Sequence, residues 1–500
     1  MNPLVWRFAV GLTPPSLTDN ASDASRLKSA LCQPGLHIPL TVLRALPAWL
    51  RDNDYTVTGC IAATGDPDNK QDNKVVSIGR QGSYGVALDI GSTNIWGELI
   101  DLDTGAVLCK EVITNPQTRY GADILTRIFY SMQEDGGAAA LHECLVGAVN
   151  AVIKSLRGEA AIAQEAIHAV VVAANTTMTH FLLNLPVNNI PTSPYIPVVN
   201  APGFQSPSNL GIEINPEGVI YLFPNAGSYV GGDIVSGIIA SKIYKSDTPS
   251  ILIDIGTNVE IAVGTKDWIL VGAGAGGPAF DEGIAGIGGR AAGGAIYDVS
   301  LDDGLNVRLL TIGGGRPSCL CGTGMVSLVA SLFEAGIIEQ NGALIDGKRN
   351  VVNSAQGSGF LLHEDGGGRQ LIVYQTEINN FLLSKAAMFT LLSVMTHTVG
   401  LAFSDVDKFI LTGALGTHIK AKDVKTLGLL PDVSEDRIIH IENASLAGAG
   451  GLLRDRSLLD DIEVITNLIT YKEMNEDTGF MNELQGAMFI PHTDMAKLKG

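Results

Sequence analysis

The sequence predicts an α/β protein in which one domain occurs twice, preceded by a small α+β domain. The length of 500 residues exceeds what one hydrophobic core supports and indicates about three domains. Two segments, 84–113 and 250–274, repeat one order of apolar strands and turns, whereas residues 1–83 follow another pattern. We therefore expect a small α+β middle or linker domain over 1–83, a first α/β lobe over 84–249, and a second lobe with a C-terminal extension over 250–500.

The first 83 residues combine helical and hairpin patterns. The stretch WRFAV is extended and is followed by two prolines, so the chain starts abruptly, as a piece of a longer parent would. Residues 27–54 are typical of helices interrupted by turns, and residues 55–80 of a hairpin with a polar tip. This mixture predicts the small α+β domain.

Each repeat consists of three short strands joined by turns. The first is VALDI, IWGELIDL and AVLCKEVI, and the second is ILIDI, VEIAV and WILVGA. Helices follow, and each repeat then returns to a buried strand, AVVVAANTTM or KFILTGALG. The helix predicted over 140–156 has one apolar face, formed by Leu141, Leu145, Val149, Val152 and Leu156. The repeated order favours a duplicated domain with a cleft between its lobes.

Composition argues against several classes of protein. Hydrophobic residues make up 46% and charged residues 17%, which is typical of a well-packed globular protein. A net charge of −19 argues against nucleic acid as a partner, because phosphate binding requires lysine and arginine patches. No apolar run reaches the roughly 18 residues of a membrane span, and the N-terminus lacks a signal-peptide pattern. We therefore expect a cytoplasmic protein without membrane association.

Six cysteines are scattered along the chain, and only Cys319 and Cys321 lie close together. Their spacing matches neither a disulfide framework nor a zinc site nor an iron–sulfur cluster. We therefore expect buried thiols at these two positions and no iron–sulfur cluster in this chain.

The first turn of each repeat carries an aspartate and a hydroxyl residue, in DIGSTN and DIGTN. Glycine lets successive backbone N–H groups bind a phosphate, and a carboxylate beside phosphate requires a cation such as Mg²⁺. We expect the two turns to clamp a triphosphate and its metal from both sides. A pair of ordinary hairpin turns is the alternative, which the matching flanks disfavour. The predicted nucleotide-binding residues here are Asp89, Gly91, Ser92, Thr93, Asn94, Asp254, Gly256, Thr257 and Asn258.

Two glycine-rich stretches are candidates for holding the nucleoside. The loop formed by Gly413, Ala414, Leu415 and Gly416 offers backbone groups to adenine or ribose. The stretch from Asn443 to Gly451 offers a second wall, with Ser445 as its candidate contact.

Three further side chains complete the predicted site. Asp233 follows two glycines at a predicted helix start, where a carboxylate can orient water near phosphate and metal; an N-cap is the alternative. Asp233 and Asp254 are the predicted catalytic residues, and together with Asp89 they are expected to hold Mg²⁺, largely through water. Lys385 is predicted to reach ribose or phosphate, with a surface lysine as the alternative. Thr176 and Thr177 follow a buried strand and either line the cleft or form a cap.

These motifs resemble the superfamily of actin, sugar kinases and heat-shock ATPases, with its ribonuclease H-like fold. LDIGSTN resembles the first phosphate loop, IDIGTNVE the second and FILTGALG the adenosine motif. The resemblance predicts a duplicated actin-like ATPase domain with an inter-lobe nucleotide cleft. Longer stretches, spread over nearly the whole chain, resemble the ATP-dependent reductive activators of corrinoid proteins. They are NPQTRYGADILTRI (115–128), VVVAANTTMTHFLL (170–183), PYIPV (194–198), GSYVGGDIVSGI (227–238), GAGGPAFDEG (274–283), CGTGMVSLVASLFEAGII (321–338) and FMNELQGAMFIPHTD (480–494).

The resemblance implies a homodimeric ATPase that uses ATP and Mg²⁺ and docks on a corrinoid protein. It implies that the ATPase promotes reduction of the partner's cobalt from Co(II) to the methyl-accepting Co(I) state. In that family the electron comes through an iron–sulfur domain of the same polypeptide. Here we expect either an external ferredoxin-like donor or an N-terminal iron–sulfur domain missing from this chain. A small-molecule kinase and a nucleotide-gated docking or assembly module are the alternative functions.

Overall fold

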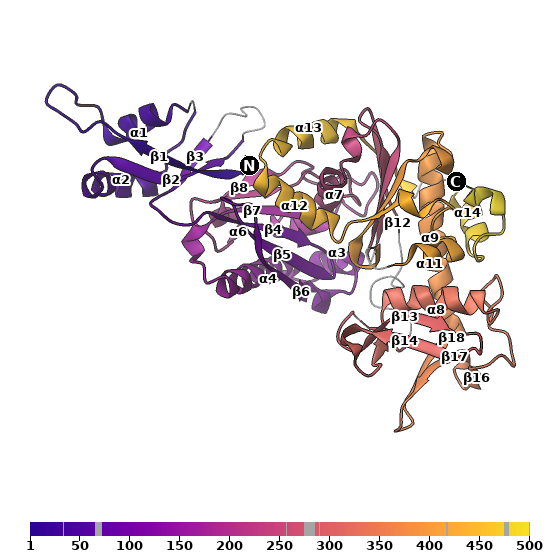
Figure 1. Cartoon of the computed structure of the whole chain (residues 1–500). Helices are drawn as coiled ribbons and strands as arrows, with labels where there is room; N and C mark the ends of the chain where they lie inside the picture. Colours follow the sequence, from indigo (N-terminus) through magenta and orange to yellow (C-terminus); the bar gives the residue numbers. More distant parts are fainter. Residues whose placement is uncertain are drawn as a thin grey trace. The chain divides into compact units, whose positions relative to one another are not determined.

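The computed structural model of the chain (Figure 1) describes residues 1–33, 35–65, 73–256, 258–274, 286–289, 291–416, 419–474 and 480–499. The chain folds as two compact units. The first comprises Met1–Ala240 and Ala444–Asn467, and the second Ser241–Asn443 and Leu468–Gly500. The segment 444–467 therefore follows the second repeat in sequence but folds with the first unit.

The N-terminal part of the first unit is a three-stranded antiparallel sheet with two helices. Strands β1 (Val5–Gly11), β2 (Thr56–Ala63) and β3 (Asn73–Ile78) pair in that order, and the helices are α1 (Asp23–Leu31) and α2 (Leu40–Asp52). Leu27, Leu46 and Leu50 of the helices are buried with Val57 and Ile61 of β2. The α+β character predicted for this part is confirmed.

The main sheet of the first unit has the strand order β6-β5-β4-β7-β9-β8. The strands are β4 (Tyr84–Ile90), β5 (Asn94–Asp101), β6 (Val107–Thr114), β7 (Ile167–Ala174), β8 (Gly203–Gln205) and β9 (Val219–Leu222). The helices are α3 (Ile124–Gln133), α4 (Gly137–Glu159), α5 (Thr176–Leu182), α6 (Pro207–Leu210), α7 (Gly232–Ser241), α12 (Ala444–Arg454) and α13 (Leu458–Leu468). The five apolar residues predicted for one face of α4 are all buried, and α4 packs on β5 and β6.

The main sheet of the second unit has the order β20-β19-β10-β11-β12-β21. The strands are β10 (Ser250–Ile255), β11 (Val259–Gly264), β12 (Ile269–Gly274), β19 (Lys408–Thr412), β20 (Ile438–His440) and β21 (Ile469–Tyr471). The helices include α9 (Gln375–Thr398), α10 (Gly413–Gly416), α11 (Ala421–Leu427) and α14 (Phe480–Ala487). Helix α9 packs on β11 and β12, and α14 packs on α9.

The two main sheets share one topology. In each, the first strand pairs antiparallel with the second and the second with the third, while the first also pairs parallel with the strand that follows the helices. A further parallel strand then extends the sheet, β9 in the first unit and β20 in the second. The predicted duplication is therefore confirmed.

Two smaller sheets of the second unit lie between β12 and α9 in the sequence. One is formed by β13 (Ala295–Leu301), β14 (Val307–Thr311) and β15 (Cys319–Leu320), and α8 (Gly322–Glu334) packs on β13. The other is the antiparallel sheet of β16 (Val351–Ser354), β17 (Gly357–Glu364) and β18 (Gln370–Tyr374).

Helices α4 and α9 are long and apolar enough, by length and composition, to cross a membrane. Scattered polar residues interrupt both apolar patterns, so neither helix is the uninterrupted apolar run that was sought in the sequence. Both helices pack on the sheet of their own unit, and the apolar windows of α4 and α9 are 39% and 67% buried. Burial of this kind is typical of a core helix in a globular protein.

Candidate functional site

The first aspartate turn lies between β4 and β5. Asp89 pairs with Trp96 of β5 on one side and with Ala173 of β7 on the other. The Gly91 N–H donates to the Asn94 carbonyl at 2.9 Å and closes the turn. Asp89 is half-buried and is the second-last residue of β4, so it lies at the carboxyl edge of the sheet, where open α/β sheets bind ligands.

Asn115 holds this turn in place. It follows β6 directly and is 0% exposed. Its N–H donates to the Thr93 carbonyl at 2.8 Å, and its side-chain Nδ2 donates to the Gly91 carbonyl at 2.9 Å. The Asn115 Oδ1 accepts the Gln117 N–H at 3.0 Å. Sequence reasoning gave Asn115 no role, although it opens the NPQTRYGADILTRI motif.

The second turn has the same position in its own sheet. Asp254 pairs with Glu260 of β11 and with Thr412 of β19, as Asp89 pairs with β5 and β7. The Gly256 N–H donates to the Asn258 carbonyl at 3.0 Å. Thr257 lies outside the described residues. The two aspartates are therefore topologically equivalent, as their sequence context predicts.

The glycine loop after β19 begins directly against Asp254. Gly413 has φ +87°, and a Cβ at this position would lie 2.3 Å from Asp254 Oδ1 and 2.6 Å from the Ile255 carbonyl oxygen. Only glycine allows this approach. The Leu415 side chain is 2% exposed and packs in the core of the second unit, so its backbone alone is available to a ligand.

Asp233 lies in the first turn of α7. Its Oδ1 accepts the Ile234 N–H at 2.8 Å. Burial raises the pKa of Asp233 to about 6, although backbone N–H groups oppose the shift. A Cβ on Gly231 would lie 2.4 Å from the Asn175 Cα, so the backbone just before α7 packs closely against the residue that follows β7. The start of α7, which carries Asp233, thus lies at the same carboxyl edge of the sheet as Asp89.

The contacts of Ser445 differ from its predicted role as a nucleotide contact. Its hydroxyl is 3% exposed and donates to the Asp233 carbonyl at 3.1 Å, while Ser236 Oγ donates to the Ser445 carbonyl at 2.6 Å. A Cβ on Gly448 would lie 2.0 Å from the Ser236 carbonyl oxygen. The small residues of α12 therefore allow close packing against α7, and Ser445 joins the two helices instead of binding nucleotide.

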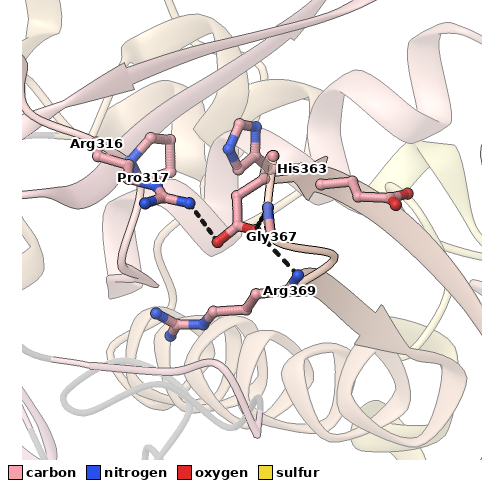
Figure 2. A pocket seen from close by; sticks show the side chains of 8 residues that line it. Arg316, Pro317, His363, Gly367 and Arg369 are labelled. Atoms are coloured by element: carbon pink, nitrogen blue, oxygen red, sulfur yellow. Dashed lines mark hydrogen bonds and ion pairs between the residues drawn. The ribbon is translucent and has the colours of Figure 1, made fainter.

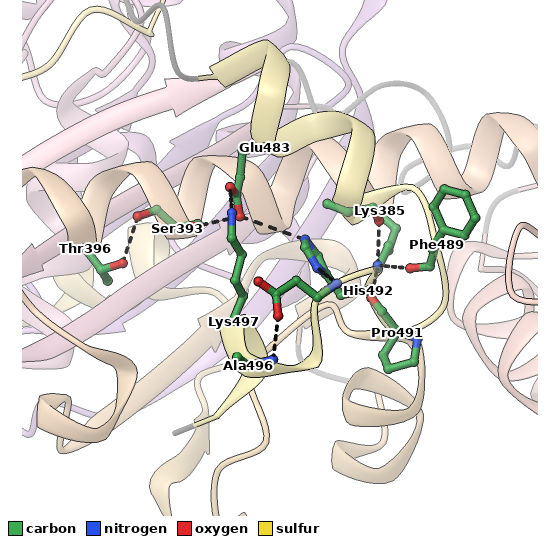
Figure 3. A network of polar contacts seen from close by, with 11 residues as sticks. Lys385, Ser393, Thr396, Glu483, Phe489, Pro491, His492, Ala496 and Lys497 are labelled. Atoms are coloured by element: carbon green, nitrogen blue, oxygen red, sulfur yellow. Dashed lines mark hydrogen bonds and ion pairs between the residues drawn. The ribbon is translucent and has the colours of Figure 1, made fainter.

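The contacts of Lys385 also differ from its predicted role of reaching ribose or phosphate (Figure 3). The side chain is 0% exposed, and Nζ donates to the carbonyls of Ala487 at 2.7 Å, Phe489 at 2.8 Å and Pro491 at 2.5 Å. An ammonium has three donors, so none is left for ribose or phosphate. The surface alternative is wrong for the same reason, because Lys385 fastens the C-terminal segment to α9.

Thr176 and Thr177 begin α5 and are nearly fully buried. Asn175 is the N-cap, since its side chain accepts the Met178 N–H at 2.9 Å, and Thr176 Oγ1 donates to the Gly227 carbonyl at 2.6 Å. Thr176 therefore has a structural contact at the start of α5, and the cap of the helix is Asn175 instead of either threonine.

The pocket shown in Figure 2 has a volume of about 730 Å³ and contains none of the predicted site residues. Arg316 pairs with Asp365, whose Oδ1 also accepts the N–H groups of Gly367 at 2.7 Å and Arg369 at 3.0 Å. These backbone bonds lower the pKa of Asp365. The carboxylate is thus already paired, and we assign the pocket no ligand.

Among the residues that the structure describes, no group of three or more histidine, cysteine or acidic side chains is placed to hold a metal ion directly. The magnesium site of Asp89, Asp254 and Asp233, which was expected to act largely through water, stays a prediction.

Three family models match the chain. They are described as the C-terminal domain of RACo, the ASKHA domain, over residues 248–500, the RACo middle region over 84–246 and the RACo linker region over 1–81. The solved structure of a reductive activator for corrinoid, iron–sulfur protein superposes with a TM-score of 0.91 at 34% identity, covering 99% of this chain and 80% of that one. The predicted actin-like ATPase fold is therefore confirmed.

Two curated relatives have related activities in their names. The corrinoid activation enzyme RamQ of Eubacterium limosum is 28% identical over 414 residues, which are 80% of this chain and 69% of the relative. The [Co(II) methylated amine-specific corrinoid protein] reductase of Methanosarcina barkeri is 24% identical over 419 residues, which are 77% of this chain and 73% of the relative.

Proposed function

Because this chain belongs to the RACo family of corrinoid reductive activators, we propose that it uses ATP to activate a corrinoid protein by promoting reduction of cobalt from Co(II) to Co(I). The observation that carries the proposal is the pair of equivalent aspartate turns, at Asp89 and Asp254, within a chain that matches a reductive activator along 99% of its length.

We assign the phosphates of ATP to the backbone of both turns. Gly91 and Thr93 of the first turn are fixed by Asn115, so their peptide groups are already ordered before a ligand arrives. Order of this kind lowers the entropic cost of binding. The Gly413 backbone, which touches Asp254, is assigned to the adenosine.

The carboxylates fit a hard cation. Asp89 and Asp254 are half-buried at the ends of their strands, and an oxygen-ligand site of one or two carboxylates with water and phosphate suits Mg²⁺. When bound, Mg²⁺ neutralises phosphate charge. Asp233 is assigned to orient the attacking water, a task for which an ionised carboxylate is required.

The expected shift of the cobalt potential follows from the thermodynamics of a one-electron reduction. Co(I) formation is a one-electron reduction, for which each tenfold change in equilibrium corresponds to about 59 mV. A coupling of about 1–3 kcal/mol between nucleotide and partner therefore shifts the cobalt potential by about 40–130 mV. Coupling requires that the activator bind the Co(II) and Co(I) states of its partner unequally, since equal affinities shift nothing.

The electron comes, in this proposal, from a low-potential donor of the ferredoxin type, supplied either by a separate protein or by an iron–sulfur domain outside these residues. Activation consumes one electron for each cobalt, while ATP and water become ADP and phosphate. We also propose that the chain acts as a homodimer.

The proposal is tested by ATP hydrolysis under anaerobic conditions, with and without a purified Co(II) corrinoid protein from the same organism. We expect hydrolysis that the corrinoid protein stimulates, and loss of hydrolysis in both Asp89→Ala and Asp254→Ala. Transfer of phosphate to a small molecule, without any effect of the corrinoid protein, would instead identify a kinase.

A further inference from the structure

Three of the motifs that resemble the corrinoid activators meet in the first unit. They are VVVAANTTMTHFLL (170–183), PYIPV (194–198) and GSYVGGDIVSGI (227–238). The first contains the end of β7 and all of α5, and the third leads into α7. The second is a loop without helix or strand, and residues of the other two hold it in place.

The loop presents apolar side chains to solvent. Ile196 is 59% exposed and Val198 is 55% exposed. Tyr195, just before them, has φ +61°, a conformation that costs a non-glycine residue of order 1–3 kcal/mol and persists only where neighbours enforce it. Its ring contacts Tyr229, with centroids 6.1 Å apart.

Three buried polar residues fix the backbone of this loop and of the two residues that follow it. Ser228, 4% exposed, donates its hydroxyl to the Tyr195 carbonyl. His180, 0% exposed, has Nδ1 against the Thr176 carbonyl at 2.7 Å, which leaves Nε2 to accept the Val198 N–H at 3.0 Å. Burial lowers the pKa of His180, so the ring is neutral, as this arrangement requires.

The third residue is Asn225, which is 3% exposed. Its N–H donates to the Asn200 carbonyl at 2.6 Å, and its Nδ2 donates to the Val199 carbonyl at 3.3 Å. Exposed apolar side chains are therefore displayed on a rigid backbone, and rigidity in the binding conformation is what increases affinity for a partner. Loops that a scaffold fixes in this way commonly carry binding residues.

Further hydrogen bonds connect these three residues to the segment that carries Asp233, the proposed catalytic carboxylate. The N–H groups of Ala226 and Gly227 both donate to the Val230 carbonyl at 2.9 Å, and Thr176 Oγ1 donates to the Gly227 carbonyl at 2.6 Å. Gly231 then packs against Asn175 and leads into Asp233. Displacing the loop therefore strains the segment that positions Asp233.

The absence of charged residues around the loop limits the kind of partner that it can bind. Residues 181–212 contain no aspartate, glutamate, lysine, arginine or histidine, although the chain as a whole carries a net charge of −19. Nucleic acid and anionic lipid surfaces require basic residues, which this stretch lacks. An uncharged apolar surface instead allows a second protein to approach without repulsion from the acidic remainder of the chain.

We propose that the loop Tyr195–Val198 is a docking site for the corrinoid protein, and that its brace of His180, Asn225 and Ser228 couples partner binding to Asp233. The inference rests on the proposed function, because that function supplies the partner. It assigns the loop a role in sensing the partner and no role in the chemistry of ATP.

The test uses the full chain with charged substitutions at the exposed tips. The double variant I196D/V198D places two carboxylates on the loop surface, and Leu125→Asp is the matched control, since Leu125 is 45% exposed on α3 of the same unit. We expect the double variant to keep basal ATP hydrolysis and thermal stability but to lose affinity for the Co(II) corrinoid protein by about tenfold or more, while L125D behaves as the wild type.

Ser228→Ala tests the coupling. Partner-stimulated hydrolysis should fall more than partner affinity, because the loop remains exposed while its connection to the Asp233 segment is weakened. If both fall in parallel, the coupling part of the proposal is wrong.

Two other outcomes would overturn the docking site. The first is unchanged affinity of I196D/V198D in a preparation whose wild type binds and responds to the corrinoid protein. The second is a change in sedimentation without a change in partner affinity, which would make the loop a contact between two copies of the chain. A wild type that neither binds nor responds to the corrinoid protein would contradict the proposed function itself.

Discussion

Gly413→Ala is the most specific single perturbation of the second aspartate turn. The backbone of Gly413 has φ +87°, which costs a residue with a Cβ about 1–2 kcal/mol. The added methyl would lie 2.3 Å from Asp254 Oδ1, where ordinary contacts begin at 3.4 Å. Either the loop or the carboxylate must then move by about 1 Å, and a misplacement of about 1 Å near the reacting groups lowers turnover about 100-fold.

The matched control is Gly400→Ala in the same unit. Gly400 has φ +70°, but a Cβ there would meet no atom within 4 Å, so this variant carries the backbone strain without the clash. We expect G413A to lose ATP affinity in calorimetry and to lose hydrolysis, while both variants stay folded at 25 °C. Equal ATP affinity and turnover in G413A and the wild type would refute the assignment of this loop to the nucleotide.

Three further predictions concern single side chains. Because burial raises the pKa of Asp233 to about 6, its carboxyl is protonated below that pH. We therefore expect kcat/KM for ATP to fall as the pH drops through about 6, and the pH profile of the Asp233→Asn variant to lack this step. Lys385→Met removes the donor to three carbonyls, of which the Ala487 carbonyl is buried and the other two are part-buried. We expect about 3 kcal/mol less stability in urea unfolding and faster proteolysis of residues 480–499, with unchanged ATP affinity. Asn115→Ala removes the donor to the Gly91 carbonyl, so ATP should bind roughly tenfold more weakly in calorimetry; unchanged affinity would separate this residue from the site.

The fold was predictable because its signal is local and repeated. Each aspartate turn lies between two apolar strands, and two copies with the same flanks predict the same sheet twice. The small sheets formed by β13–β15 and β16–β18 gave no comparable signal, since β14, β15 and β16 have only two to five residues each.

Site residues were predictable where their role depends on their own turn. They were not predictable where their role depends on contacts with distant parts of the chain. Asp89 and Asp254 follow from their turns, but the role of Asn115 depends on a bond to Gly91, which lies 24 residues earlier. Ser445 lies in a stretch of glycine and alanine, which suits either a ligand or a close helix neighbour; the structure shows the neighbour. Lys385 has its acceptors about 100 residues away in the sequence, beyond the reach of any local pattern.

The most direct test of the account is the cobalt spectrum of the Co(II) corrinoid protein, followed anaerobically with this chain, a low-potential reductant, and either ATP or no nucleotide. The account predicts that Co(I) accumulates only when the chain and ATP are both present, and that Asp89→Ala and Asp254→Ala each abolish the change. Co(I) formation at the same rate without ATP, or with both variants, would contradict it.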